Sequence, residues 1–144
     1  MTERKQYCTF YVDNLFFGID VLKVQEIIRN QEMAPVPLAP PVISGLINLR
    51  GQVVTAMDLR QRLGLKPAEE GHLPLNVIIN GEDTVSFLVD EIGDVIQPEL
   101  DSFELPPETI EGQVRAVISG VHKLDDRLML VMDADKTMEL QTAA

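Results

Sequence analysis

One segment of the chain occurs twice, and this duplication limits what the chain can fold into. ISGLINLRGQVVTAMD, from Ile43 to Asp58, returns without a gap as ISGVHKLDDRLMLVMD, from Ile118 to Asp133. The distance between the copies is too long for a solenoid of small repeats. We therefore expect one small fold that is written twice. Gly45 and Gly120 match each other, which indicates a backbone requirement of that fold.

The two copies differ at one turn. The first reads NLRG over residues 48–51, and the second reads KLDD over residues 123–126. Gly51 can supply the positive φ of a tight hairpin turn, so Arg50 is expected at an exposed tip, where its guanidinium can fork onto a carboxylate. Arg50 could simply make a turn soluble. Because the second copy folds without an arginine there, we interpret Arg50 as a functional residue.

The composition is that of a protein with a full hydrophobic core. The chain has 144 residues, and 45% of them are hydrophobic. The expected barrel copies, 7–66 and 75–140, are each marginal in size, so we expect them to pack together in one domain over residues 1–144. A strand of one copy could also complete the barrel of the other.

The net charge of −11 narrows the classes of partner. Residues 1–66 hold eight Lys/Arg and six Asp/Glu, whereas the remaining residues hold four and seventeen. Nucleic acid and anionic membranes repel such a chain, so neither is expected as a partner. A single cysteine, no secretory signal pattern and no apolar run of roughly 20 residues predict a cytoplasmic protein that does not insert into a membrane.

Alternating apolar residues predict about ten short strands in two sets of five. The predicted strands cover 7–13, 15–19, 47–49, 53–57, 77–79, 85–89, 114–118, 122–124 and 128–132. Residues 21–29 are predicted as a short helix that leads into a strand, and residues 92–96 echo residues 24–28. Proline-rich connectors separate them. This pattern is typical of an all-β protein with two small barrels.

Residues 21–29 leave two interpretations open. Ile27 and Ile28 could face the core and leave Val21 and Val24 as a small exposed patch, which often marks an interface. Alternatively, all four side chains lie in the core. Cys8 alternates with apolar residues, which favours a packed core thiol over a nucleophile, although it could also lie on an apolar contact surface.

No residue pattern favours catalysis, a metal or a cofactor. His72 and His122 have no cysteine or second histidine at ligand spacing, and we expect them in ordinary surface or half-buried positions. Asp58 and Asp133 occupy the same place in the duplication, which favours two helix N-caps over a metal site. The acidic stretch 90–94 is expected in a solvated turn.

The segment ISGLINLRGQVVTAMDLRQRLG, preceded by VQEII and a proline-rich connector, resembles the CheW family of chemotaxis coupling proteins. The resemblance runs from about Tyr7 to Leu140. Residues 55–57, TAM, replace the Pro-Val-Ile-like run usual in the family, but threonine is compatible with a strand. The resemblance implies an all-β fold in which two five-stranded SH3-like barrels, with short helices, pack on a shared hydrophobic core.

The resemblance also implies a non-enzymatic adaptor without cofactors. Such proteins join the cytoplasmic tips of methyl-accepting chemoreceptors to the regulatory domain of the histidine kinase CheA. The matching receptor-binding residues are Glu26, Gly45, Asn48 and Arg50, and we expect Glu26 and Arg50 to pair.

The same resemblance places Val21 and Val24 at the kinase contact, with Cys8 at its border. The domain also occurs inside CheA and CheV, and we expect the stand-alone form here. Two other functions stay open at this point. One is a regulator that binds a CheA-like kinase without a receptor, and the other is a metal-dependent enzyme that uses aspartates.

Overall fold

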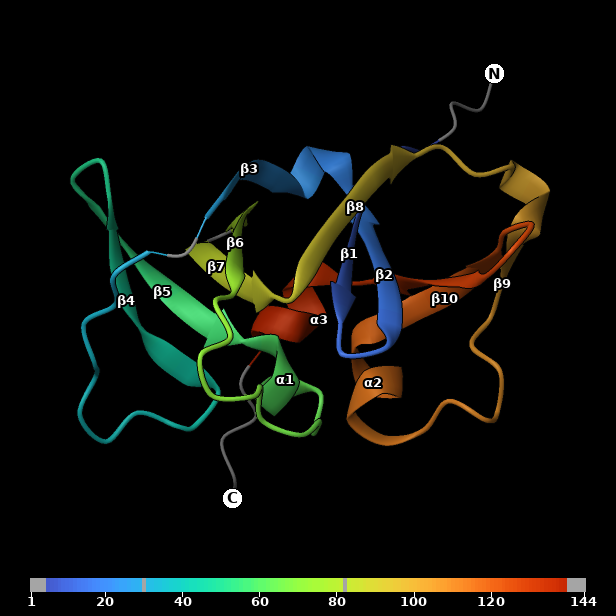
Figure 1. Cartoon of the computed structure of the whole chain (residues 1–144). Coiled ribbons are helices and arrows are strands. Elements are labelled where there is room, and N and C mark those ends of the chain that lie inside the picture. The colour runs from blue at the N-terminus through green and yellow to red at the C-terminus, as the bar shows by residue number, and fades with distance from the viewer. Residues whose placement is uncertain (1–4, 30, 82, 140–144) are drawn as a thin grey trace.

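The computed structural model describes residues 5–29, 31–81 and 83–139, which form mainly short strands (Figure 1). The strands are β1 (Tyr7–Val12), β2 (Leu15–Asp20), β3 (Val24–Ile28), β4 (Ile43–Leu49), β5 (Gln52–Asp58), β6 (Leu75–Asn80), β7 (Thr84–Val89), β8 (Glu91–Ile96), β9 (Phe103–Glu104), β10 (Ile118–Lys123) and β11 (Leu128–Met132). The helices are η1 (Val21–Lys23), α1 (Leu59–Arg62), η2 (Leu100–Ser102), α2 (Gly112–Val117) and α3 (Ala134–Met138), of which η1 and η2 are 3₁₀ helices.

Two sheets exchange strands between the repeated segments. One sheet has the order β8-β1-β2-β11-β10-β9, and the other has the order β3-β6-β7-β5-β4. Residues 7–66 and residues 75–140 therefore each contribute strands to both sheets. Within each sheet, one parallel and one antiparallel pair join the two copies. The parallel pairs are β2 with β11 and β5 with β7, and the antiparallel pairs are β1 with β8 and β3 with β6.

Each sheet buries apolar residues on both of its faces: one face lines the inside of its own barrel, and residues of the other face pack in a cluster shared with the second sheet. Along β1, for example, Phe10 and Val12 point into a large cluster shared by the two sheets, whereas Tyr7 and Tyr11 pack in a separate cluster with residues of the same sheet. The five-stranded sheet has its own inner cluster, which includes Ile47 and Val54. The fold is thus two SH3-like barrels on a shared core, and the short strand β9 makes one of them six-stranded.

The matched glycines allow a second segment of chain to approach each barrel closely. A Cβ on Gly45 would lie 2.7 Å from the carbonyl oxygen of Ala34, which exchanges two backbone hydrogen bonds with Leu46. A Cβ on Gly120 would lie 2.6 Å from the carbonyl oxygen of Glu104. Both glycines are therefore required by the backbone, as the duplication predicted.

Every predicted strand overlaps an observed one, but Val114–Ile118 does so only at Ile118, and the prediction was wrong for residues 114–117. These residues end the helix α2 and begin β10. The guanidinium of Arg115 donates to the carbonyls of Pro107 (2.7 Å) and Ile110 (3.0 Å), which holds the helix against its own connector. Val114 and Val117, three residues apart, pack on the core at helical spacing.

The two matched aspartates are helix N-caps, as predicted. The Oδ1 atom of Asp58 accepts from the backbone N–H of Arg60 (2.9 Å), and the Oδ1 atom of Asp133 accepts from the backbone N–H of Lys136 (3.1 Å). Each cap satisfies a backbone donor that the first turn of a helix leaves without a partner. Asp58 and Asp133 thus have the same structural role in the two copies, which is to cap a helix.

Replacing Asp58 by alanine should lower the free energy of unfolding by about 1 kcal/mol, because α1 loses its cap. Urea unfolding at neutral pH measures the change. The matched control Asp58→Asn keeps an acceptor oxygen and should lie close to the parent chain. Equal destabilisation by the two substitutions would contradict the capping role.

Candidate protein-binding surface

The turn between β4 and β5 presents Arg50 at its tip. Arg50 has a φ of 51° and Gly51 a φ of 87°, so both central residues of the turn are left-handed, as in the type I′ turn of a tight hairpin. The backbone N–H of Gly51 donates to the side-chain Oδ1 of Asn48 (2.8 Å). A non-glycine residue rarely adopts a positive φ, so this hairpin holds Arg50 in an unusual conformation.

The guanidinium of Arg50 forks onto the carboxylate of Glu26, as predicted. Nη1 donates to Oε1 (3.2 Å), and Nη2 donates to Oε2. Glu26 lies on β3, at the opposite edge of the five-stranded sheet from β4. The pair therefore joins the two edges of the sheet at the mouth of this barrel.

The pair is open to solvent on the arginine side. The side chain of Arg50 is 67% exposed, and that of Glu26 is 25% exposed. The hydrogen bond from Arg50 lowers the pKa of the Glu26 carboxyl, and the same bond raises the pKa of Arg50. A guanidinium has five N–H donors, so an oriented Arg50 keeps donors available for a partner.

The predicted receptor-binding residues do not all touch one another. Glu26 and Arg50 are in direct contact, and Asn48 fixes the turn that carries Arg50. Gly45 lies further along β4, where Ala34 packs over it. Gly45 is buried, so the structure shows for it only the backbone role described above.

The stretch 21–28 follows neither of its two expected arrangements. Val21 and Val24 are half-buried and pack on the shared core, and Ile28 packs on the inner cluster of the five-stranded barrel. Ile27 is exposed, and Leu22 is 83% exposed. The reason is local, because the carboxylate of Asp20 accepts from the backbone N–H of Leu22 and starts the 3₁₀ turn η1.

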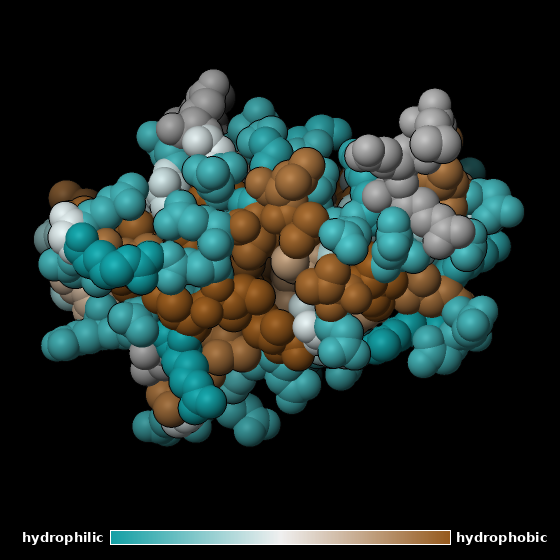
Figure 2. Space-filling model, turned by 90° about the horizontal axis from the view of Figure 1, so that it is seen from above, coloured by the Kyte–Doolittle hydropathy of each residue, from teal (hydrophilic) through white to brown (hydrophobic). Residues whose placement is uncertain are grey.

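Figure 2 views the molecule from the side on which η1, β3 and β8 lie in Figure 1, and it shows apolar surface gathered in the middle of this face. β3 and β8 are the edge strands of the two sheets. Leu22, Ile27 and Val95 are large apolar residues that stay exposed on these three elements. We call them the apolar face. Sequence reasoning missed Leu22, although the cap residue Asp20 signals the turn.

Cys8 is a core thiol. It lies in the shared cluster, and burial raises the pKa of the thiol, with a further increase from the nearby Asp20 carboxylate. This agrees with the favoured interpretation of the sequence. Cys8 can influence the apolar face only through the packing beneath it.

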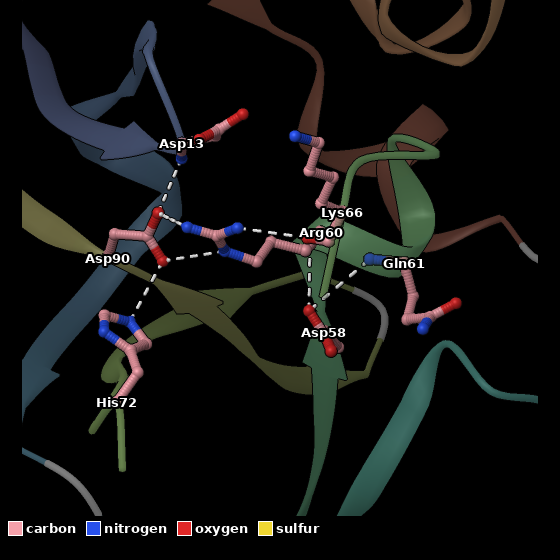
Figure 3. A network of polar contacts seen from close by, with 7 residues as sticks. All are labelled: Asp13, Asp58, Arg60, Gln61, Lys66, His72 and Asp90. Carbon is pink, nitrogen blue, oxygen red and sulfur yellow. Dashed lines mark hydrogen bonds and ion pairs between the residues drawn. The ribbon is translucent and has the colours of Figure 1, made fainter. Parts of the chain in front are cut away.

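Asp90 ties the two barrels together. It stands between β7 and β8, where the chain passes from the five-stranded sheet to the six-stranded one. As Figure 3 shows, its carboxylate accepts from Nη2 of Arg60 (2.7 Å), from Nε of Arg60 (3.2 Å) and from the backbone N–H of Asp13 (2.5 Å). Nε2 of His72 lies 3.1 Å from Oδ1 of Asp90.

The prediction of a solvated turn was therefore wrong for Asp90, whose side chain is only 14% exposed. It was also wrong for Glu91 and Asp94, which are exposed but lie on strand β8. Burial alone would raise the pKa of the Asp90 carboxyl. The hydrogen bonds from Arg60 and from the backbone of Asp13 outweigh burial, so the pKa lies below its ordinary value of 3.8.

The two histidines have different surroundings. His72 belongs to the linker and contacts Asp90. His122, on β10, is buried more deeply than expected, between the rings of Tyr7 and Phe103. Its Nδ1 lies 2.7 Å from the hydroxyl of Ser102, and burial lowers its pKa.

Among the described residues, no helix is both long enough and apolar enough to span a membrane.

Comparison with known proteins agrees with this geometry. The family model of the CheW-like domain matches residues 6–141. The chain belongs to the CheW-like domain family. It is 33% identical to the chemotaxis protein CheW of Treponema pallidum (strain Nichols) over 150 residues, which cover 99% of this chain and 88% of the relative. The chemotaxis protein CheW of Bacillus subtilis (strain 168) is also 33% identical, over 93% of this chain and 86% of its own length.

A solved structure supports the same assignment. The crystal structure of the scaffolding protein TtCheW from Thermoanaerobacter tengcongensis superposes with a TM-score of 0.85 and is 26% identical in sequence. The match covers 96% of this chain and 94% of that protein. The double-barrel fold that the sequence resemblance implied is thus confirmed.

Replacing Asp90 by asparagine should lower the free energy of unfolding by about 1.5–3 kcal/mol at neutral pH, because charge-assisted hydrogen bonds across the barrels are lost. The pKa of Asp90 is lowered in the folded state, so its contribution is complete above the unfolded value near 3.8 and disappears as the pH falls through the folded value. The difference between variant and parent should therefore shrink in acid.

Urea titrations at a series of pH values measure this difference. Asp94→Asn is the matched control, because Asp94 is an exposed carboxylate on β8, and it should change stability little. A difference for Asp90→Asn that stays constant down to strongly acidic pH would contradict the assignment.

Proposed function

We propose that this chain is a non-enzymatic adaptor in chemotaxis signalling, which couples the cytoplasmic tips of chemoreceptors to the histidine kinase CheA. The relatives that share nearly its whole length are named chemotaxis proteins, and the similar solved structure is described as a scaffolding protein. The observation that carries the proposal is the exposed Arg50 tip, which the Glu26 carboxylate orients and which the second copy of the fold lacks.

The receptor contact is the Arg50 tip. A guanidinium that is held by one carboxylate and open on its other side suits a partner that offers carbonyl or carboxylate oxygens. Glu26 and Asn48 position the tip, and Gly45 sets the path of β4 beside it. Binding would use geometry and charge, and it requires no reaction step.

The kinase contact is the apolar face. Val21 and Val24 form its half-buried base, with Cys8 in the core below, and Leu22 is its most exposed side chain. Such a face suits the regulatory domain of the kinase, because burying exposed apolar side chains drives association. The two contacts lie on a rigid double barrel, so receptor and kinase can be held in a fixed relation.

Charge reversal at the tip should separate binding from folding. Arg50→Glu should weaken co-sedimentation with receptor-bearing membranes by roughly tenfold or more, since a central arginine contact is often worth 2 kcal/mol or more. Its thermal unfolding should change little, because the side chain is mostly exposed. Leu73→Glu, at an exposed position of the linker outside this hairpin, is the control and should keep receptor binding.

The double variant Glu26→Arg with Arg50→Glu tests what the partner recognises. The ion pair is restored with its charges exchanged, so the tip should again be oriented. If the receptor recognises the guanidinium at position 50, binding stays weak in this variant. Unchanged receptor binding by Arg50→Glu itself would remove this residue from the site.

Leu22→Glu should weaken binding of the isolated CheA regulatory domain by roughly tenfold while receptor binding persists, because a charge then replaces an exposed apolar contact. Leu22 tests the face more cleanly than Val21, whose replacement would also disturb the core. Leu73→Glu, in the exposed linker, is the matched control. Calorimetry measures the affinity, and loss of both partners together would indicate misfolding instead.

A further inference from the structure

His122 is a buried titratable side chain that the proposed adaptor function does not use. It lies on β10 and is 5% exposed. The ring centres of Tyr7 and Phe103 lie 5.6 Å and 5.3 Å from its own. The hydroxyl of Ser102 donates its one proton to the carbonyl of Glu99 (2.8 Å), so we assign Nδ1 of His122 as the donor to that hydroxyl oxygen. A second proton on the ring would therefore go to Nε2 and make the ring a cation.

The ring is an anchor for a segment that has few other attachments. β9 contains two residues, and its ladder with β10 consists of the pairs Val121–Glu104 and His122–Phe103. The preceding 3₁₀ turn, η2, has no buried residue and no side-chain cap. A segment with so short a ladder and so little burial opens at a low cost in free energy. Its contacts with His122, through Ser102 and Phe103, therefore weigh heavily in holding it closed.

The groups that pack around the ring are neutral. They come from β1, η2, β9 and β11, and they are Tyr7, Ser102, Phe103 and Met129. Tyr7 is the one among them that titrates near its ordinary pKa of 10. Burial, and to a lesser extent the Asp20 carboxylate, raise that pKa further, so Tyr7 carries no charge at neutral or acidic pH.

The charged groups of these elements point elsewhere. Glu104 on β9 pairs with Lys123 (3.2 Å), and Glu99 and Asp101, beside and within η2, have exposed side chains. Among the described residues, no carboxylate hydrogen-bonds to the His122 ring. A protonated His122 would be a buried cation without a counter-ion, which is costly. Burial accordingly lowers the pKa of His122 below its ordinary value of 6.5.

We propose that His122 makes the packing of η2 and β9 against β10 depend on pH, because the neutral ring holds this segment in place and protonation of the ring releases it. When η2 and β9 move away, water reaches the ring and solvates its charge. The segment opens while both barrels stay folded, since the shared core does not include Ser102 or Phe103.

The direction of the effect follows from the lowered pKa. The closed segment binds the proton less tightly than the open one, so the contribution of His122 to closure is complete above the ordinary value of 6.5. That contribution is lost progressively as the pH falls below this value toward the pKa of the closed state. The proposal uses neither the Arg50 tip nor the apolar face, so its failure would leave the proposed adaptor function intact.

Amide hydrogen exchange of the whole chain, followed by mass spectrometry, tests the switch. After correction for the intrinsic effect of pH, residues 99–105 should exchange roughly three- to tenfold faster at about pH 5.5 than at about pH 7.5, because a proton one pH unit below the ordinary pKa can shift the equilibrium by about tenfold at most. β6 and β7 should keep their protection at both pH values, which separates local opening from unfolding of the chain.

Two variants assign the effect to one side chain. His122→Gln keeps a hydrogen-bond donor for Ser102 but cannot titrate, so exchange of residues 99–105 should no longer respond to pH. The matched control is His72→Gln, because His72 lies in the linker beside Asp90, and this variant should respond as the parent chain does. An unchanged rate for residues 99–105 in the parent chain, or the same acceleration in His122→Gln, would overturn the proposal.

A second measurement on the parent chain does not depend on the folding of any variant. An NMR titration should show the ring of His122 and the backbone amides of Ser102, Phe103 and Glu104 changing together, with a midpoint below 6.5. A midpoint at or above 6.5, or amides that do not follow the ring, would contradict the switch.

Discussion

The strand pairs that join residues 7–66 to residues 75–140 hold the rest of the structure in place. They are β2 with β11 and β5 with β7, which are parallel, and β1 with β8 and β3 with β6, which are antiparallel. Each pair joins a strand of one copy, residues 7–66, to a strand of the other copy, residues 75–140, so neither copy has a complete sheet of its own. The shared core, with Phe10, Phe17 and Phe87 at full burial, then fixes one barrel against the other. Asp90 adds a polar tie at the crossing between the sheets. An adaptor that must hold two partners in a fixed relation needs this kind of rigidity.

The functional differences lie where the two copies stop matching. Strand β8 corresponds to β3 in the second copy, so Asp94 occupies the place of Glu26. The turn of the second copy that matches the Arg50 turn contains Asp125 and Asp126. Carboxylates there cannot form the forked pair that orients the Arg50 tip. In that region Arg127 instead lies over the ring of Phe16, 4.1 Å from its centre. The scaffold was duplicated, and one mouth of the double barrel carries an exposed arginine that the other mouth lacks at the matching turn.

The sequence predicted most strands and the helix caps, because each depends on local periodicity or on the duplication. The pair between Glu26 and Arg50 was expected from the family resemblance, and the structure shows it. It could not assign strands to sheets, since parallel partners lie far apart along the chain and alternation does not identify them. The segment Val114–Ile118 was misassigned because its apolar residues are compatible with a strand as well as a helix. Asp90 and Leu22 were missed for a related reason, because their environments are set by tertiary contacts and by a single 3₁₀ turn.

Taken as an adaptor, the chain should have its effect only when receptor and kinase are both present. The most direct measurement is the autophosphorylation rate of CheA mixed with receptor-bearing membranes, with and without this chain. We predict that the chain raises the rate in the ternary mixture and leaves it unchanged when the receptor is omitted. An unchanged rate in the ternary mixture, with both partners shown to be active, would contradict coupling as the function of this protein.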